Sequence, residues 1–366
     1  MSLSIGIVGL PNVGKSTLFN ALLGKQQALA ANYPFATIEP NVGVVPVPDE
    51  RLAKLAKVVH TEKMVPAMVE FVDIAGLVKG AASGEGLGNK FLTHIREVDL
   101  ICHVLRAFDD GEVVRFGGGL PSYRRVNTVG SQVGPEEDYQ IVEAELIIKD
   151  LETLLRSKRA SEGQAVKDFY EKLFAHLDGG KPARTMVMTE KELEWIRGLF
   201  LLTMKDEVAV VNLSEGHLDQ VAKIESELGL ELGMPVVGLS AKIESELAEL
   251  GKGEALVYLK ELGVEESGLD RLIKLVYGKL GLISFLTAGE QEVRAWTIKD
   301  GSKAPRAAGV IHTDFEKKFI KAKVCDYADF IECGGWKNAA EKGKVRMEGR
   351  NYVMKEGDVV EFMIGS

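Results

Sequence analysis

Cysteine is scarce in this chain of 366 residues: the three thiols, Cys102, Cys325 and Cys333, include no C-x-x-C pair. Their odd number and wide spacing argue against a disulfide framework or a zinc site. No apolar run approaches the ~20 residues that cross a bilayer. The first eight residues carry no basic stretch ahead of an apolar core. We therefore expect no membrane association and no secretory signal, and the cytoplasm is the expected compartment.

Positive charge is also in short supply, because the net charge is −9. This disfavours wholesale binding of nucleic acid. The deficit is uneven, since residues 282–366 hold 14 basic against 13 acidic side chains. Four lysines crowd into seven positions of that segment: Lys317, Lys318, Lys321 and Lys323. A solvated face is the more ordinary interpretation of such a run, and an RNA-facing patch is the alternative.

Short apolar or β-branched runs predict strands that alternate with helical patterns. The predicted strands are Leu3–Val8, Val42–Val47, Met68–Asp73, Leu100–Leu105, Val208–Asn212 and Pro235–Ser240. Helical patterns follow at Lys15–Leu23, which should end at Gly24, and at Asn89–Val98. The alternation predicts an α/β fold with a mostly parallel sheet.

Two segments break this alternation. Between about 138 and 206 the pattern is helical, with predicted helices at Tyr139–Arg159, Glu162–Leu177 and Thr189–Met204. Apolar residues share one face of each of the first two helices: Ile147, Leu151, Leu154 and Leu155 in one, and Phe169, Leu173, Phe174 and Leu177 in the other. A projecting antiparallel pair is expected, with helices packed flat on the domain as the alternative.

The second such segment begins at Leu282. Its predicted strands are Glu292–Ile298, Lys321–Val324, Tyr352–Met354 and Val359–Met363. We expect a nucleotide-binding domain from residues 1–137 and 207–281, a helical insert at 138–206, and a small α+β domain at 282–366.

A glycine-rich segment gives the first functional motif. Gly9-Leu10-Pro11-Asn12-Val13-Gly14-Lys15-Ser16 fits G-x-x-x-x-G-K-[S/T], with a predicted strand before it and a helix after it. Backbone N–H groups of such a loop point at phosphates and add to the positive end of the helix. Lys15 is expected on the β- and γ-phosphates and Ser16 on Mg²⁺. The predicted nucleotide contacts here are Asn12, Val13, Gly14, Lys15, Ser16 and Thr17.

Two further segments are expected to complete the phosphate site. Asp73-Ile74-Ala75-Gly76 follows a predicted strand, so that Asp73 can hold Mg²⁺ through a water and the N–H of Gly76 can sense the γ-phosphate. Thr37 lies in the segment between the two motifs. Its hydroxyl is suited to ligate Mg²⁺ and to release on hydrolysis, which would make the loop a switch. An ordinary turn threonine is the alternative.

The base-recognition segment departs from what guanine requires. A GTPase of this class uses N-K-x-D, whereas this chain has Asn212-Leu213-Ser214-Glu215. Leu213 lacks the lysine stem that lies over the base, and the carboxylate of Glu215 is displaced by one methylene. Asn212 can still bond a purine, and Ser240 and Ala241 place backbone groups beside the base. Guanine discrimination should therefore be weak.

These motifs resemble the Obg-like ATPase (YchF) family, a branch of the translation-factor GTPases that uses ATP. The resemblance extends over nearly the whole chain and rests on the segments Gly9–Thr17, Asn32–Asn41, Asp73–Ala81, Gly84–Asn89, Asn212–Glu215, Arg294–Thr297 and Ala308–Glu316. It implies a Ras-like domain, a coiled-coil insert and a C-terminal TGS domain with a β-grasp fold. It also implies ATP hydrolysis coupled to ribosome binding, and a role in translation or stress responses.

The resemblance leaves the hydrolytic group open. Many GTPases place a water-orienting glutamine after the D-x-x-G glycine, where this chain has Leu77. Asn12 occupies the position that helps to hold K⁺ in potassium-dependent relatives. Relatives often carry a histidine in the loop after the fourth strand, at or near Arg115 here. Arginine stays protonated, so Arg115 could stabilise transition-state charge but could not act as a base.

The interpretation is therefore an ATPase switch, slow without a partner, with catalytic candidates Lys15, Gly76 and Arg115. Expected ligands are Mg²⁺, held by Ser16, Thr37 and Asp73, and ATP in preference to GTP. The ribosome is the expected partner, with rRNA or tRNA contact through the TGS domain and the helical arm. The alternatives are a ribosome- or RNA-binding module with negligible hydrolysis, and an ordinary GTPase.

Overall fold

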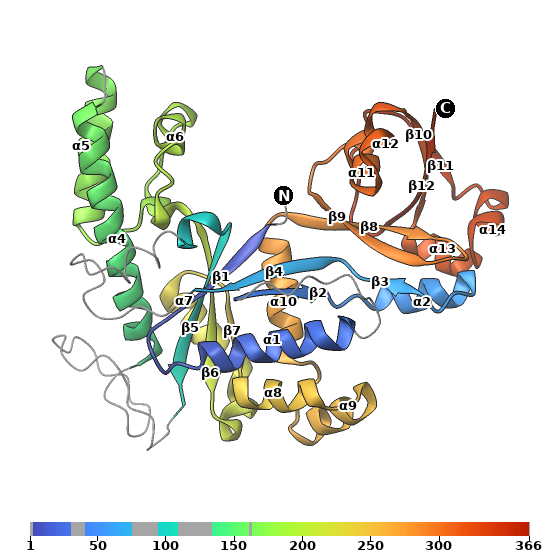
Figure 1. The fold of residues 1–366 in the computed structure, drawn as a ribbon, viewed down its shortest axis with the longest axis horizontal. Coiled ribbons are helices and arrows are strands. Elements are labelled where there is room, and N and C mark those ends of the chain that lie inside the picture. The colour runs from blue at the N-terminus through green and yellow to red at the C-terminus, as the bar shows by residue number, and fades with distance from the viewer. Residues whose placement is uncertain (1–2, 31–40, 75–93, 109–133, 161–162, 366) are drawn as a thin grey trace. The chain divides into compact units, whose positions relative to one another are not determined.

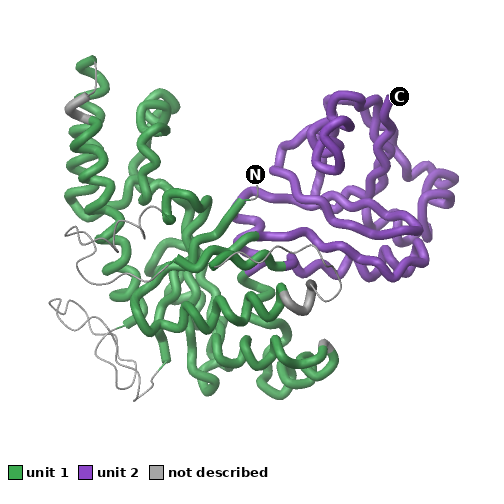
Figure 2. Tube along the Cα trace, in the orientation of Figure 1, with its two compact units in different colours: residues 1–45, 70–272 green, residues 46–69, 273–366 purple. Residues whose placement is uncertain are grey.

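The computed structural model describes residues 3–30, 41–74, 94–108, 134–160 and 163–365. The chain forms two compact units, drawn in different colours in Figure 2. Unit 1 consists of residues 1–45 and 70–272, and unit 2 of residues 46–69 and 273–366.

A six-stranded sheet forms the centre of unit 1, with the strand order β2-β4-β1-β5-β6-β7 (Figure 1). The strands are β1 (Ser4–Val8), β2 (Val42–Pro46), β4 (Met68–Asp73), β5 (Leu100–Ala107), β6 (Asp206–Leu213) and β7 (Val236–Leu239). The pairings of β1 with β4 and β5, and of β6 with β5 and β7, are all parallel. Every residue of β1 is buried, as expected for a parallel strand that is covered on both faces. The predicted α/β fold is confirmed.

Helices of unit 1 include α1 (Lys15–Ala30), α7 (Val221–Leu232), α8 (Ala241–Glu249) and α9 (Lys252–Glu261). Helix α10 (Gly268–Lys279) begins in unit 1 and ends in unit 2. The prediction that α1 ends at Gly24 is wrong, because the helix continues for six residues beyond it. A Cβ atom at Gly24 would lie 2.7 Å from the Cβ of Ala248 on α8. Gly24 is therefore a point of close helix–helix approach, where a larger residue would keep α1 and α8 apart.

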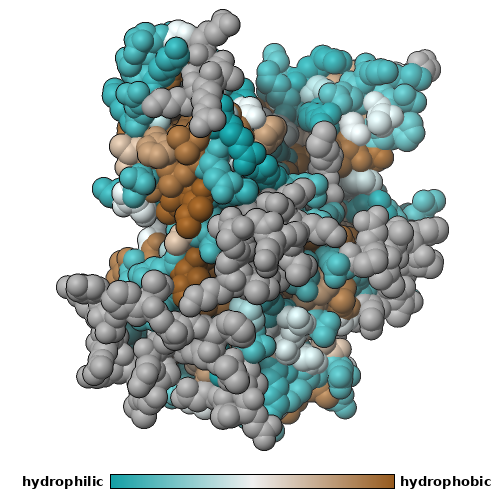
Figure 3. Space-filling view, turned by 60° about the vertical axis from the view of Figure 1, so that its left-hand side comes forward, coloured by the Kyte–Doolittle hydropathy of each residue, from teal (hydrophilic) through white to brown (hydrophobic). Residues whose placement is uncertain are grey.

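The helical insert contains α4 (Pro135–Ala160), α5 (Gln164–Asp178) and α6 (Glu190–Arg197), seen at the left of Figure 1. A shared apolar core joins them, formed by Ile147, Leu154, Phe169, Tyr170, Leu173, Leu177, Ala183, Ile196 and Leu201. The expectation for Leu155 is wrong, because its side chain is 44% exposed, as Ile148 is at 43%. Figure 3 shows apolar atoms among the hydrophilic ones on the face that it draws.

The third predicted helix of the insert is also shorter than expected, because α6 ends at Arg197, with Gly198 as its C-cap, instead of continuing to Met204. After it, the chain turns back so that Asp150 on α4 accepts hydrogen bonds from the N–H groups of Leu202 and Thr203 and from the Thr203 hydroxyl. These bonds satisfy a buried carboxylate, which would be costly without them. Asp150 thus holds the 3-10 turn Leu202–Met204, which lies where the sequence predicts helix.

Unit 2 contains a mixed sheet with the order β11-β10-β12-β8-β9-β3. Its strands are β3 (Met64–Val65), β8 (Leu282–Ala288), β9 (Val293–Lys299), β10 (Phe319–Asp326), β11 (Arg346–Glu348) and β12 (Asp358–Ile364). Its helices are α2 (Glu50–Val59), α11 (Ala304–Ile311), α12 (Thr313–Lys317), α13 (Tyr327–Cys333) and α14 (Trp336–Glu341). Tyr352–Met354 is not a regular strand, since Val353 forms only an isolated bridge with Lys303.

The segment of residues 46–69 groups with unit 2, although the sequence boundaries assign it to the nucleotide-binding domain. Strand β3 pairs with β9, with Met64 opposite Val293. The guanidinium of Arg51, in the first turn of α2, forms an ion pair with Glu356. These contacts join positions more than 200 residues apart, and no local pattern reveals them. The three-domain boundaries themselves stay a prediction.

Candidate nucleotide-binding site

The phosphate-binding loop connects β1 to α1, and its backbone takes up conformations that favour glycine. Residues Gly9, Asn12 and Gly14 have φ angles of 154°, 65° and 100°. A Cβ atom at Gly9 would lie 2.6 Å from the carbonyl oxygen of Val104, and one at Gly14 would lie 2.2 Å from Nδ2 of Asn212. Both glycines of the motif are therefore required by backbone conformation and by space.

Lys15 is the first residue of α1, and its side chain is 8% exposed. Its Nζ donates a hydrogen bond of 2.7 Å to the carbonyl oxygen of Leu10 within the same loop. Burial lowers the pKa of Lys15, and the negative charge of Asp73 acts in the opposite direction. Burial likewise raises the pKa of Asp73, which the positive charge of Lys15 opposes. The charges of Lys15, at the start of α1, and Asp73, at the end of β4, thus stabilise each other.

The position of Asp73 follows from the sheet register. Asp73 is the last residue of β4 and is paired with Ile7 of β1. It therefore lies beside the carboxyl end of β1, where the phosphate-binding loop begins. Ser16 and Thr17 are exposed on the first turn of α1. Carboxylate and hydroxyl oxygens are ligands that Mg²⁺ accepts, usually together with waters and phosphate oxygens. The donor set of Ser16 and Asp73 therefore fits magnesium.

Asn212 joins three parts of the site. It lies near the end of β6 and is 6% exposed. Its Nδ2 donates to the carbonyl oxygen of Val13 at 3.0 Å, and its Oδ1 accepts from the N–H of Ala241 at 2.9 Å. The amide that the sequence suggested for purine contact is thus bonded at both ends to the protein backbone. It holds the phosphate loop against the start of α8.

The remaining base-recognition candidates differ in exposure. The side chain of Leu213 is 3% exposed and packs in an apolar cluster with Leu105, Val211 and Leu228, which leaves its backbone for a ligand. Glu215 is exposed at the start of a 3-10 turn. Ser240 and Ala241 are buried, with Ala241 the first residue of α8. Thr37, Gly76, Leu77 and Arg115 lie outside the described residues.

Sequence reasoning missed the residues that support α8 and β7 beside the site. Glu244 on α8 accepts from the Ser267 hydroxyl at 2.6 Å and from the N–H of Gly268 at 2.7 Å. Arg271 donates to the carbonyl oxygen of Gly238 in β7 and to Glu225. The sequence offers one indication of these contacts, a glutamate at a buried position of a helix, but no motif identifies the partners of Glu244.

A lysine-bearing loop between a buried parallel strand and a helix, beside an aspartate that ends the adjacent strand, defines a protein of the P-loop GTPase class. In agreement, the family model described as "50S ribosome-binding GTPase" matches residues 4–156. The YchF-GTPase_C model, described as "Protein of unknown function (DUF933)", matches residues 282–365.

Full-length relatives give the family. The chain is 48% identical over 377 residues to the "Ribosome-binding ATPase YchF" of Bacillus subtilis and 45% identical to that of Haemophilus influenzae, covering 99% of each chain. The structure of the Schizosaccharomyces pombe YchF GTPase is 37% identical, with a TM-score of 0.84 over 99% of this chain and 98% of that one. The chain belongs to the YchF family.

Proposed function

We propose that this chain is a nucleotide-operated switch that binds and slowly hydrolyses ATP and associates with ribosomes. The observation that carries the proposal is the Lys15 loop, which Asn212 fastens to the start of α8. Because β1, β6 and α8 meet there, a change at the phosphates can reach the base-binding edge through one side chain. The names of the relatives supply the ribosome as the partner.

The preference for ATP is the part of the proposal that concerns the base. Guanine recognition in N-K-x-D proteins needs a lysine stem over the base, whereas here the side chain of Leu213 is packed in the apolar core. Glu215 is exposed and one methylene longer than the usual aspartate. Relatives carry both ATPase and GTPase in their printed names, so the base must be tested directly.

Calorimetric titration of nucleotide-free protein with non-hydrolysable ATP and GTP analogues in magnesium buffer tests this preference. We expect the ATP analogue to bind at least tenfold tighter, a difference of about 1.4 kcal/mol. The Glu215→Asp variant should recover part of the GTP affinity, because its carboxylate returns to the usual length. The Lys15→Ala variant is the control and should lose both ligands alike. Equal binding of both analogues by the wild type would refute the preference.

The cation requirement follows from the same edge of the sheet. We propose Mg²⁺ on Ser16, Thr37 and Asp73, and K⁺ near Asn12. Since Asn12 has φ = 65°, Asn12→Gly removes the amide while keeping a residue that tolerates this conformation. Phosphate release in KCl and in NaCl should differ for the wild type and not for Asn12→Gly. Equal rates of the wild type in both salts would remove K⁺ from the proposal.

The helical insert and the C-terminal domain are proposed as the parts that contact the ribosome and its RNA. We assign the insert to a coiled-coil arm and residues 282–366 to a TGS domain on the family's pattern. Co-sedimentation with ribosomes should depend on whether an ATP analogue or ADP is present. The rival is a binding module with negligible hydrolysis. Phosphate release measured with and without ribosomes distinguishes the two, since the rival predicts none in either condition.

A further inference from the structure

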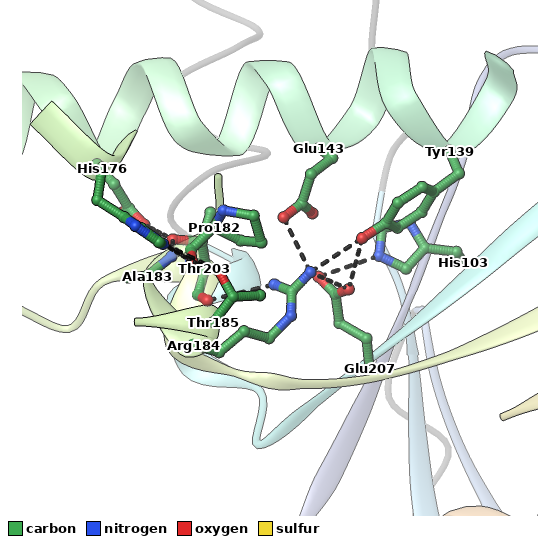
Figure 4. Close-up of polar contacts among 11 residues, drawn as sticks. His103, Tyr139, Glu143, His176, Pro182, Ala183, Arg184, Thr185, Thr203 and Glu207 are labelled. Carbon is green, nitrogen blue, oxygen red and sulfur yellow. Dashed lines mark hydrogen bonds and ion pairs between the residues drawn. The ribbon is translucent and has the colours of Figure 1, made fainter. Parts of the chain in front are cut away.

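A second polar cluster lies in unit 1, between the sheet and the insert, and no step at the phosphate site uses it (Figure 4). His103 comes from β5, Glu207 from β6, and Tyr139 and Glu143 from α4. Arg184 enters from a 3-10 turn, Ala183–Thr185, and its guanidinium lies among the others in Figure 4. His103, Glu143 and Glu207 are 0%, 6% and 5% exposed.

Arg184 binds only part of this cluster. Its Nη2 contacts Oε1 of Glu143 at 2.9 Å and Oε2 of Glu207 at 2.6 Å, and it donates to the Tyr139 hydroxyl at 2.9 Å. The other carboxylate oxygens, Oε2 of Glu143 and Oε1 of Glu207, are buried without a hydrogen-bond partner. Each glutamate therefore has one oxygen engaged by the arginine and one oxygen without a hydrogen-bond partner.

His103 lies beside these two oxygens. Both of its ring nitrogens are buried without a hydrogen-bond partner, and Nε2 lies 3.4 Å from Oε1 of Glu207. One ligand atom from each of His103, Glu143 and Glu207 lies within 4.8 Å of those of the other two. A buried polar atom without a hydrogen-bond partner is costly, and these three residues hold four such atoms in one place, which points to a missing partner.

We propose that His103, Glu143 and Glu207 bind a divalent transition cation of the zinc class. One imidazole nitrogen and two carboxylate oxygens suit Zn²⁺, whereas Mg²⁺ and Ca²⁺ favour all-oxygen sites. The cysteine count bears on thiolate sites only and leaves this one untouched. Arg184 holds the second oxygen of each carboxylate, which is the supporting contact that orients ligands in metal sites. Water fills the fourth position of a tetrahedral site.

The acidic side chains of the cluster outnumber the basic side chain that contacts them. Glu143 and Glu207 both face the single guanidinium of Arg184. A bound cation would add positive charge among these buried oxygens, and so would a proton taken up by the cluster. The proton without a metal is the rival that the experiment must separate.

A cation here would fasten the first helix of the insert to two neighbouring strands of the sheet. The ligands come from α4, β5 and β6, and β6 continues from Glu207 to Asn212, the residue that holds the phosphate loop. Metal binding would thus stiffen the base of the insert without contacting nucleotide. The inference is independent of which nucleotide the chain prefers.

Metal-stripped, nucleotide-free full-length protein tests the site, in buffer with excess Mg²⁺ so that Asp73 does not bind zinc. Elemental analysis after dialysis against Zn²⁺ should give one equivalent per chain. Substitution with Co²⁺ should give visible absorption typical of a low-coordinate nitrogen and oxygen site. His103→Asn and Glu207→Gln should each weaken zinc binding at least tenfold. His94→Asn is the matched control, because His94 is exposed and 3.8 Å from Glu97.

The wild type decides the matter even if a buried variant fails to fold. A wild-type chain that takes up less than a tenth of an equivalent of Zn²⁺ and shows no Co²⁺ absorption overturns the proposal and leaves a protonated cluster without metal. Stoichiometric binding that His94→Asn loses and His103→Asn retains also overturns it, because the ion is then on the surface. Retained binding by His94→Asn with loss in the two cluster variants supports it.

Discussion

Replacement of Asn212 by alanine should weaken both the fold of unit 1 and its nucleotide site. The substitution removes the hydrogen bonds to Val13 and from Ala241, and it leaves that carbonyl and that N–H buried without partners. Two lost bonds at about 1 kcal/mol each, with the added cost of unsatisfied groups, predict a loss of about 2–4 kcal/mol. Nucleotide affinity should fall as well, because the loop at Gly14 loses its contact with β6.

Differential scanning calorimetry checks the stability term. Because the chain has two compact units, one unfolding free energy is not defined for the whole. The transition of unit 1 is recognised as the one that a non-hydrolysable ATP analogue shifts upward. Asn212→Ala should lower that transition and leave the other in place. Asn20→Ala is the control, because Asn20 is exposed on α1 and its loss should stay within about 0.5 kcal/mol.

The reasoning would be refuted if Asn212→Ala changed neither the nucleotide-responsive transition nor the affinity for the analogue. A large loss of stability with unchanged affinity would show that the side chain supports the fold alone. An unchanged transition with lost affinity would instead mean that Asn212 contacts the purine directly, as its place in the sequence first suggested.

Three other changes test separate parts of the structure. Gly24→Ala should destabilise unit 1 by about 1–3 kcal/mol, although alanine has the better helix propensity, because its Cβ would clash with Ala248. Adding Ala248→Gly to the same chain should restore the stability. If calorimetry showed that Gly24→Ala alone is more stable than the wild type, the close approach of the two helices would be contradicted. Lys15→Ala should abolish phosphate release while leaving the melting transition of unit 2 in place, and normal turnover would remove Lys15 from the site. Burial raises the pKa of Cys102 to about 12, so this side chain stays a thiol at pH 8. It should therefore not react with a thiol reagent until the protein unfolds. Mass spectrometry that located the label on Cys102 of the folded protein would disprove this.

The sequence alone predicted the features that depend on residues close together in the chain. The segment Gly9–Thr17 carries its own turn geometry, since its glycines permit the positive φ angles observed at Gly9 and Gly14. The buried strands β1, β5 and β6 are built mainly of apolar residues, and Asp73 ends another such strand, β4. In the part of the chain that the structure describes, these elements lie in the predicted order, and no helix is long and apolar enough to cross a membrane.

The tertiary structure decided what depends on partners far away in the chain. Gly24 looked like a helix end because propensity is local, but the contact with Ala248 is made by another helix. Helix was predicted as far as Met204, but there the buried carboxylate of Asp150, far upstream, binds the backbone of Leu202 in a 3-10 turn. Asn212 was placed on the base by its motif, yet its amide satisfies Val13 and Ala241.

The buried His103 cluster belongs to the same category. Its members lie on two strands, one helix and one turn, and no spacing in the sequence relates them. Only the parallel pairing of β5 with β6 and the packing of α4 against the sheet bring their side chains together. The sequence thus determined the loop and the strands, through local backbone preference and hydrophobic pattern. The fold determined which polar groups meet, because burial forces each of them to find a partner wherever the chain supplies one.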